Sequence, residues 1–305
     1  MQVLVTGADG FIGTHLTAQL LDAGWQVDVV ARRQAPSGVR RRYQTLEAAG
    51  DGLDGLDHIL YVAGLAHEAG ANAADNAHLA VNAHAPMALL RAAHAAGVRR
   101  FVYLSSFKVL GDSSPTPLGV HAPYRGTGPY AESKIAAERL MLDAGPGPCQ
   151  RVIVRPPLTY GPGVKANFLR LLRWADSPWP IPVGNARAPR AWLGVHNLVA
   201  LLVHLLEAAG DLDGRILHVA DREQVGAGAM FAALRSEFGR RIPALRLPLP
   251  LLSWLARGLG RQDTYARLFD GLPMDTSGTE DLGWRPPYSQ AEQIRRTVAW
   301  YRTRA

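Results

Sequence analysis

Short apolar runs rich in valine, isoleucine and leucine alternate with helical patterns through the first two-thirds of the chain. The apolar runs lie at residues 2–7, 25–31, 56–64, 99–106, 150–157 and 215–221, and the main helical patterns at 11–24, 78–97, 129–145, 195–210 and 289–302. Continuously apolar strands joined by crossover helices are typical of a parallel sheet that is covered on both faces. The alternation therefore predicts an α/β fold with a doubly wound parallel sheet.

The pattern loosens after residue 157, where prolines interrupt residues 178–189 and 243–250. We therefore predict two interleaved domains. Residues 1–157, completed by about 190–222, form the domain of the parallel sheet. Residues 158–189 and 223–305 form a smaller C-terminal cap domain.

Cysteine and histidine usage limits the classes of site that the chain can hold. Cys149 is the only cysteine, so an internal disulfide is excluded, and the ten histidines form no set with metal-ligand spacing. We expect no metal site and a reducing compartment, the cytoplasm. The N-terminus lacks the pattern of an export signal, and no run has the length of an integral membrane segment.

The most apolar stretch of the second half is "LPLPLLSWLARGLG" at residues 247–260. It is short and interrupted by prolines, so we interpret it as a core or pocket-covering element. A peripheral contact with a membrane or a partner is the alternative.

The net charge of +7 comes mainly from arginine and is scattered, apart from a cluster at residues 31–44. No helix-turn-helix, zinc finger or aromatic-interleaved motif accompanies it, so we do not expect a nucleic-acid partner. A small molecule that carries phosphate groups suits these charges better.

The segment "TGADGFIG" follows the first predicted strand directly and opens the first predicted helix. Gly7, Gly10 and Gly13 stand at the spacing of a dinucleotide-binding loop, in which glycine allows a sharp turn and a close approach to a pyrophosphate. Phe11 and Ile12 begin the helix, whose N-terminus supplies N–H donors. These five residues predict a Rossmann-type cofactor site.

The second predicted strand ends in Ala31, Arg32 and Arg33. A carboxylate at this place would bind the ribose 2′-hydroxyl of NAD, whereas a guanidinium can bind the 2′-phosphate of NADP. The two arginines favour NADP(H), although NAD(H) stays possible. Arg40, Arg41 and Arg42 follow without an evident role.

Three further residues suggest proton transfer beside this cofactor. The strand "FVYLSS" ends in Ser105 and Ser106, at the sheet edge where ligands of such folds bind. In "PYAESK", Tyr130 and Lys134 are four residues apart and share one face of a helix. A nearby ammonium group is expected to lower the pKa of the Tyr130 phenol.

With these motifs the chain resembles the extended short-chain dehydrogenases/reductases over essentially its full length. It is most similar to the nucleotide-sugar branch related to UDP-glucose 4-epimerase, through "FVYLSSFKVLGD", "PYAESKIAAERL", "VRPPLTYGPGVKANFLRLL" and "DLGWRPPYS". The resemblance is closest to bacterial 4-reductases and 4-epimerases of UDP-N-acetylhexosamines, which act in O-antigen and lipopolysaccharide precursor synthesis. It implies that the cap domain binds the substrate.

The resemblance implies roles for the motif residues. Counting back from Gly111, Ser106 rather than Ser105 matches the catalytic serine, and Tyr130 and Lys134 match the proton donor and the lysine that holds the nicotinamide ribose. Further cofactor contacts are implied for Ala63, Gly64, Asn82 and Pro157. Asn82 matches an asparagine that interrupts a helix and organises water near the lysine, with a simple helix-start role as the alternative.

Substrate contacts are implied for Ser106, Lys165, Asn167, Arg190 and Arg267. Arg190 matches an arginine that grips the pyrophosphate of a UDP-sugar. Asn167 matches a residue near the diphosphate, with a helix cap as the alternative. Two departures stand out: Val109 and Leu110 follow the serine where relatives often have Val-Tyr, and the segment after Arg33 is short enough to make one strand–helix unit degenerate.

Three functional interpretations follow. The favoured one is an NADP(H)-dependent 4-ketoreductase of a UDP-4-keto-6-deoxy-N-acetylhexosamine, because a reductase exchanges its cofactor and the arginines favour NADPH. A 4-epimerase of a UDP-hexose or UDP-N-acetylhexosamine with retained NAD is the first alternative. A non-catalytic NADP-sensing binding protein is the second. Relatives are often homodimers, so we expect one here.

Overall fold

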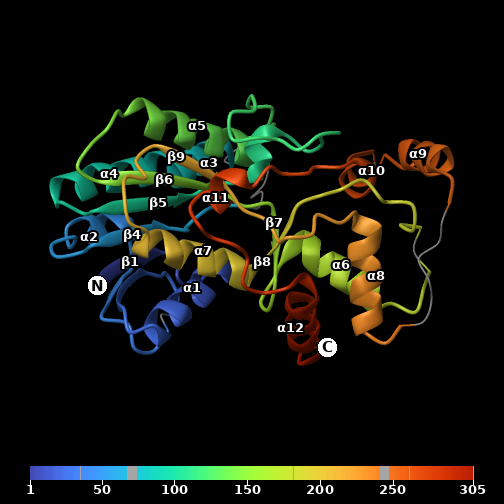
Figure 1. Ribbon diagram of the computed structural model, residues 1–305, viewed down its shortest axis with the longest axis horizontal. Coiled ribbons are helices and arrows are strands. Elements are labelled where there is room, and N and C mark those ends of the chain that lie inside the picture. The colour runs from blue at the N-terminus through green and yellow to red at the C-terminus, as the bar shows by residue number, and fades with distance from the viewer. Residues whose placement is uncertain (35, 67–73, 181, 241–246, 261, 305) are drawn as a thin grey trace.

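The computed structural model describes residues 1–34, 36–66, 74–180, 182–240, 247–260 and 262–304, and within helices the side chains of residues 74, 75, 263, 264 and 267 lie outside the description. The chain forms two layered parts (Figure 1). A large parallel sheet with helices on both faces lies on the left of the view, and a smaller, mainly helical part lies on the right.

The large sheet has seven strands in the order β3-β2-β1-β4-β5-β6-β9, and every neighbouring pair is parallel. The strands are β1 (Gln2–Thr6), β2 (Gln26–Val30), β3 (Arg41–Tyr43), β4 (His58–Tyr61), β5 (Arg100–Leu104), β6 (Gln150–Arg155) and β9 (Arg215–His218). The strand order reverses direction between β1 and β4, which is the point where doubly wound sheets bind their ligands. The predicted fold class is therefore confirmed.

Helices cover both faces of this sheet. One face packs on α1 (Phe11–Asp22) and α7 (Val195–Glu207), whose leucines and valines form one buried cluster with β1 and β2. The opposite face packs on α2 (Leu46–Gly50), α4 (Ala85–Ala95) and α5 (Pro129–Asp143). Burial on two sides explains why the strands read as continuous apolar runs.

The degenerate strand–helix unit expected after Arg33 is present in shortened form, as the three-residue β3 and the five-residue α2. The single helix predicted for residues 78–97 is wrong in detail. The structure divides this region into α3 (Ala74–Leu79), the π-helix η1 (Ala80–His84) and α4.

The smaller part is built on a parallel pair of short strands, β7 (Leu158–Tyr160) and β8 (Trp192–Gly194). Its helices are α6 (Ala166–Asp176), α8 (Ala227–Glu237), α9 (Leu249–Gly258), α10 (Gln262–Phe269) and α12 (Gln290–Arg302), while η2 (Phe107–Leu110) and α11 (Ser277–Glu280) lie in connections. A separate apolar cluster joins α6, α8, β8 and α12. The domain boundaries stay a prediction; β8, which falls in the stretch 190–222 expected to complete the sheet domain, packs with the smaller part.

The stretch at 247–260 agrees with only part of the favoured sequence interpretation. It contains α9, in which Leu252 is the one buried residue among those described, so a core role is wrong, whereas Ser253, Ala256 and Arg257 do line a pocket. Packing against α10 covers only one side of α9, and the side that carries Trp254 stays exposed. Among the described residues, no helix combines the length and the apolarity needed to cross a bilayer.

Candidate active site

The glycine loop forms a tight cradle between β1, α1 and β4. Gly7 has a positive φ of 67°, and a Cβ atom on it would lie 2.8 Å from the Cα atom of Ala63. A Cβ atom on Gly13 would lie 2.1 Å from the carbonyl oxygen of Gly7. Side chains at these two positions would therefore clash with the backbone.

The N-terminus of α1 opens onto this cradle. Its N-cap residue is Gly10, which provides no side-chain cap, so the first-turn N–H groups are left for another acceptor. Phe11 and Ile12 begin the helix and pack partly buried against the core. A close-approach glycine turn with uncapped helix N–H groups fits the pyrophosphate of a dinucleotide.

The loop after β2 carries the two arginines expected to select the cofactor. Arg32 and Arg33 are both exposed at this corner. The backbone N–H of Arg33 donates to a carboxylate oxygen of Asp9 in the glycine loop at 3.3 Å. The two loops are thus joined, and Arg32 and Arg33 lie exposed beside the glycine loop.

Arg42 supports this loop from β3, a role that the sequence did not indicate. Its guanidinium donates to the backbone carbonyls of Ala31 at 3.2 Å, Arg32 at 3.3 Å and Arg33 at 2.5 Å. Arg40 has a different task, because it forms a bidentate ion pair with the buried Asp28, with a shortest distance of 2.6 Å. The arginine cluster therefore contains two residues with structural hydrogen bonds, Arg40 and Arg42, as well as the candidate cofactor residues Arg32 and Arg33.

The two serines after β5 have separate environments. Ser106 is the N-cap of η2, and its hydroxyl oxygen accepts from the backbone N–H of Lys108 at 3.3 Å. The Ser106 hydroxyl also lies close enough to the Tyr130 phenol to lower the pKa of that phenol. Ser105 is buried and donates to the carboxylate of Glu138 instead. The structure thus brings Ser106 to Tyr130, and gives Ser105 a place in a buried structural network.

Tyr130 and Lys134 project from the first turns of α5, where Pro129 occupies the start of the helix. The Lys134 ammonium group is buried, donates to the carbonyl of Leu104 at 2.8 Å and lies 4.5 Å from the centre of the Tyr103 ring. Desolvation lowers the pKa of Lys134 to about 7, although the carboxylate of Glu138 acts in the opposite direction. Lys134 is therefore close to titration at neutral pH.

The lowered pKa predicted for Tyr130 is not reached with the protein's own groups alone. Burial raises the pKa of the Tyr130 phenol above its ordinary value, and the Ser106 hydroxyl offsets only part of this rise. Burial also disfavours the charged form of the neighbouring Lys134. A low phenol pKa therefore requires additional charge or hydrogen bonding beyond that of the serine.

Asn82 lies at the centre of the π-helix η1 and is buried. Its side-chain oxygen accepts from the N–H of Leu65 at 2.9 Å, and its amide nitrogen donates to the carbonyl of Leu65 at 3.1 Å and to Ser133 at 2.9 Å. Ser133 in turn donates to the carbonyl of Tyr130 at 2.8 Å. The helix interruption is present, and the alternative of a simple helix-start residue is wrong.

The sequence contains the cause of this interruption in Pro86. A proline has no N–H to donate to the carbonyl four residues earlier, which belongs to Asn82. The hydroxyl of Tyr103 donates to that carbonyl at 2.6 Å, and the hydroxyl of Tyr61 donates to the carbonyl of Val81 at 2.9 Å. Two strand tyrosines thus satisfy the carbonyls that the π-turn releases, and π-turns often mark functional sites.

Gly64 and Pro157 were predicted to border the cofactor. A Cβ atom on Gly64 would lie 3.4 Å from the side-chain oxygen of Asn82 and 3.6 Å from the Lys134 nitrogen. Ala63 precedes it and packs against Gly7. Pro157 follows β6 and is half-buried beside Leu158, the first residue of β7.

His78 is a neighbour of the site that the sequence analysis missed. Its ring lies edge-on to the Tyr130 ring, with 6.5 Å between centroids, and its exposure is 1%. Among the described residues, neither ring nitrogen has a hydrogen-bond partner. The available signal was its position one helical turn before Asn82.

The predicted substrate residues lie in the smaller part or at its border. Lys165 and Asn167 are exposed at the start of α6, and Lys165 rather than Asn167 is the N-cap, so the alternative cap role of Asn167 is wrong. Ala166 between them has a φ of 52°, the one positive value of a non-glycine residue in the described part of the chain. Such backbone strain is commonly found at ligand sites.

Arg190 connects the two parts of the molecule. Its guanidinium donates to the backbone carbonyls of Asp112 at 3.3 Å and Asp270 at 2.9 Å, and its backbone pairs with Leu272. It therefore lies near the loop that follows η2, on the Ser106 side of the sheet. Arg267 is part of α10, but its side chain lies outside the described residues.

The comparison with known proteins decides the family. The sequence model of the NAD dependent epimerase/dehydratase family matches residues 3–220. The chain belongs to this family. The predicted kinship with extended short-chain dehydrogenases/reductases, a group of nucleotide-sugar epimerases, dehydratases and reductases, is thereby confirmed, and so is the prediction of an enzyme.

The proteins to which this chain is similar include both an epimerase and a reductase. UDP-glucose 4-epimerase of Vibrio cholerae is 29% identical over 314 residues, which cover 97% of this chain and 94% of that protein. GDP-6-deoxy-D-mannose reductase of Pseudomonas aeruginosa is 33% identical over 222 residues, which cover 67% and 70%. The structure of MoeE5 in complex with UDP-glucose and NAD superposes with a TM-score of 0.76 at 25% identity, covering 100% of this chain and 99% of that one.

Proposed function

We propose that this protein is an NADP(H)-dependent 4-ketoreductase that acts on a UDP-4-keto-6-deoxy-N-acetylhexosamine. The observation that carries the proposal is the proximity of the Ser106 hydroxyl, which follows β5 at the carboxyl edge of the sheet, to the Tyr130 phenol of α5, on the side that also holds the glycine cradle. A hydroxyl and a phenol that lie side by side can both reach one substrate oxygen. This arrangement suits reduction of a ketone to an alcohol.

The chain's residues divide the reaction between proton transfer and positioning. A bound nicotinamide supplies the hydride that adds to C4. Tyr130 then gives its phenolic proton to the C4 oxygen, so that the ketone becomes a hydroxyl group, and Ser106 donates a hydrogen bond that fixes the same oxygen. Lys134 would hold the ribose next to the nicotinamide, and in its protonated form it would stabilise the phenolate that remains on Tyr130.

The backbone around Tyr130 is held by a chain of hydrogen bonds. Asn82 binds Ser133, and Ser133 binds the carbonyl of Tyr130. Since the same asparagine also binds both backbone groups of Leu65, it ties α5 to the loop after β4. We propose that this link keeps the phenol in register with the cofactor site.

The exposed pair Arg32 and Arg33 favours the reductase over an epimerase. Guanidinium groups suit a 2′-phosphate, and a reductase draws on exchangeable NADPH. The alternative is a UDP-hexose or UDP-N-acetylhexosamine 4-epimerase with retained NAD, and the Vibrio cholerae relative, which spans nearly the whole chain, supports it. A non-catalytic NADP-sensing protein is disfavoured because serine, tyrosine and lysine are all present.

We further propose that Lys165, Asn167, Arg190 and Arg267 contact the UDP moiety. The strained Ala166 and the place of Arg190 between the two parts support this assignment.

The remaining proposals are a role in lipopolysaccharide O-antigen precursor synthesis, a cytoplasmic location and a homodimer. Light scattering tests the last of these, with twice the chain mass of 33.0 kDa expected.

The decisive experiment examines the cofactor of the purified protein. Protein without stoichiometric cofactor that oxidises NADPH in the presence of a UDP-4-keto-6-deoxy sugar would support the reductase. Tightly held NAD together with interconversion of C4 epimers would support the epimerase. Binding of NADPH without turnover of any UDP-sugar would favour the sensing protein.

A further inference from the structure

Helix α9 turns an apolar stripe toward solvent. Leu251, Trp254, Leu255 and Leu259 follow one another at the spacing of a single helix face, with Leu259 at the C-cap. Their side chains are 44%, 68%, 40% and 72% exposed, respectively. A surface helix of a globular protein normally buries such a stripe, so this face is built for contact with something outside the chain.

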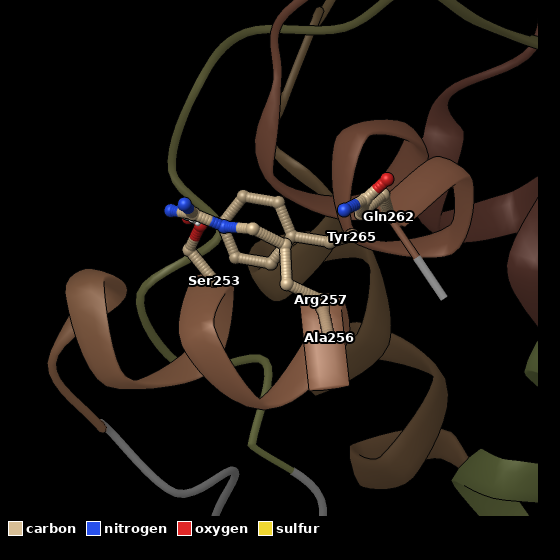
Figure 2. Close-up of a pocket in the computed structure, with 5 residues that line it drawn as sticks. All are labelled: Ser253, Ala256, Arg257, Gln262 and Tyr265. Carbon is tan, nitrogen blue, oxygen red and sulfur yellow. Dashed lines mark hydrogen bonds between the residues drawn. The ribbon is translucent and has the colours of Figure 1, made fainter. Parts of the chain in front are cut away.

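The opposite side of α9 packs against α10. Figure 2 shows Ser253, Ala256 and Arg257 of α9 gathered beside Gln262 and Tyr265 of α10, around a small cavity of about 150 Å³. Leu252 supplies the buried anchor of the helix. The inward side of α9 is therefore already used, and the apolar stripe points away from the body of the protein.

The sequence around α9 is positively charged. Residues 238–262 contain five arginines and neither aspartate nor glutamate, and one of the five, Arg240, is ion-paired with Asp176 of α6. Arg257 stands on α9 at the border between the side that faces α10 and the side of Trp254; its side chain is exposed, and one guanidinium nitrogen donates to the hydroxyl of Ser253 at 3.2 Å. A tryptophan and leucines bordered by arginine are the composition of helices that lie in the interface of a bilayer, where anionic headgroups attract the cations.

We propose that α9 docks this protein on the surface of an anionic lipid bilayer. The stripe inserts among the acyl chains near the headgroups, and Arg257 binds the headgroup phosphates. The ten-residue helix spans about 15 Å, half of the hydrocarbon thickness, so it lies in the surface and does not cross it. This surface is independent of the cofactor site, since α9 and the sheet lie at opposite ends of the molecule (Figure 1).

The test is co-sedimentation of the full-length protein with vesicles of phosphatidylcholine, with and without phosphatidylglycerol. We expect partitioning to rise on the order of tenfold with the anionic lipid and to weaken at high salt. The double variant Trp254→Glu, Leu255→Glu loses this binding. The matched control is the double variant Leu140→Glu, Leu142→Glu, which adds the same two charges at leucines of α5 that are 41% and 38% exposed.

Each outcome bears on the proposal. Retained vesicle binding in the double variant, or equal binding to neutral and anionic vesicles, would overturn it. No vesicle binding together with a smaller mass of the double variant in light scattering would identify a second copy as the occupant. Circular dichroism confirms that the double variant is folded, and unchanged NADPH binding separates a failure here from a failure of the proposed enzyme function.

Discussion

The carboxylate of Glu138 and the guanidinium of Arg155 form a bidentate ion pair whose two side chains are 0% and 1% exposed. The shortest nitrogen–oxygen distance is 2.5 Å. Ser105 and Tyr124 also donate to this carboxylate. The pair joins α5, which carries Tyr130 and Lys134, to β6 and to the end of β5, so the proposed catalytic helix is anchored by a buried charge.

Replacement of Glu138 by glutamine should strongly destabilise the fold. The substitution keeps the size of the side chain but leaves Arg155 buried without a counter-charge, and we expect the free energy of unfolding to fall by about 3–5 kcal/mol. Asp176→Asn is the control, because its ion pair with Arg240 is solvent-exposed and should contribute less than about 1 kcal/mol. Urea denaturation measures both, and equal losses would contradict the prediction.

Replacement of Tyr130 by phenylalanine should remove the proton donor and leave the cofactor site intact. We expect turnover to fall by roughly a hundredfold or more, with NADPH affinity little changed. Steady-state kinetics and fluorescence titration of NADPH separate the two effects. Turnover equal to that of the wild type would rule out the assignment of Tyr130.

Arg32 and Arg33 should make NADPH bind more tightly than NADH. In the double variant Arg32→Ala, Arg33→Ala, we expect the ratio of the two affinities to narrow by about tenfold or more, because charge-assisted hydrogen bonds to the 2′-phosphate are lost. Calorimetric titration with both cofactors provides the measurement. Equal affinities in the unmodified protein would refute this role of the arginines.

Arg42 should influence the ratio of the NADPH and NADH affinities indirectly. Its guanidinium holds the carbonyls of Ala31, Arg32 and Arg33, so Arg42→Ala frees the loop and should narrow the ratio by roughly two- to tenfold. Arg41→Ala removes the same charge from the exposed neighbouring position on β3. If both variants change the ratio equally, the effect is one of general charge and the bracing role is wrong.

Lys134 should make stability depend on pH in a defined window. Its pKa is about 7 in the folded chain and 10.5 ordinarily, so between these values the unfolded state binds more protons than the folded state. The free energy of unfolding contributed by this group therefore rises with pH from about 7 upward and is lowest below pH 7.

A variant without an ionisable group at position 134 tests this pH dependence of the stability. Lys134→Met should raise the melting temperature at pH 7, measured without added cofactor, and the gain should shrink as the pH approaches 9.5 (~2.5 units above the folded pKa). Lys165→Met is the control at an exposed position. A gain that is constant with pH would show that Lys134 is not desolvated.

Much of the fold and part of the site follow from local patterns. The alternation of apolar strands and helices sets a parallel sheet, and the glycines of "TGADGFIG" mark where a side chain would strike the backbone. Tyr130 and Lys134 are four residues apart, so both lie on the same face of α5. Such features are fixed by residues close in sequence, because periodicity and glycine spacing act within one strand or helix.

Other features depend on residues that are distant in sequence, and only the tertiary structure decides them. The pKa of Lys134 depends on its burial in the folded chain and on the charge of Glu138, and the carbonyls that the π-helix releases at Val81 and Asn82 are satisfied by hydroxyl groups of Tyr61 and Tyr103. Arg42 reaches back across the sheet to brace the loop after β2. The exposed stripe of α9 is the clearest case. Its leucines and tryptophan have the spacing of a buried helix face, but α10 packs against the other side of the helix. A sequence pattern predicts which residues share a helix face, and only the tertiary structure decides whether another element covers that face.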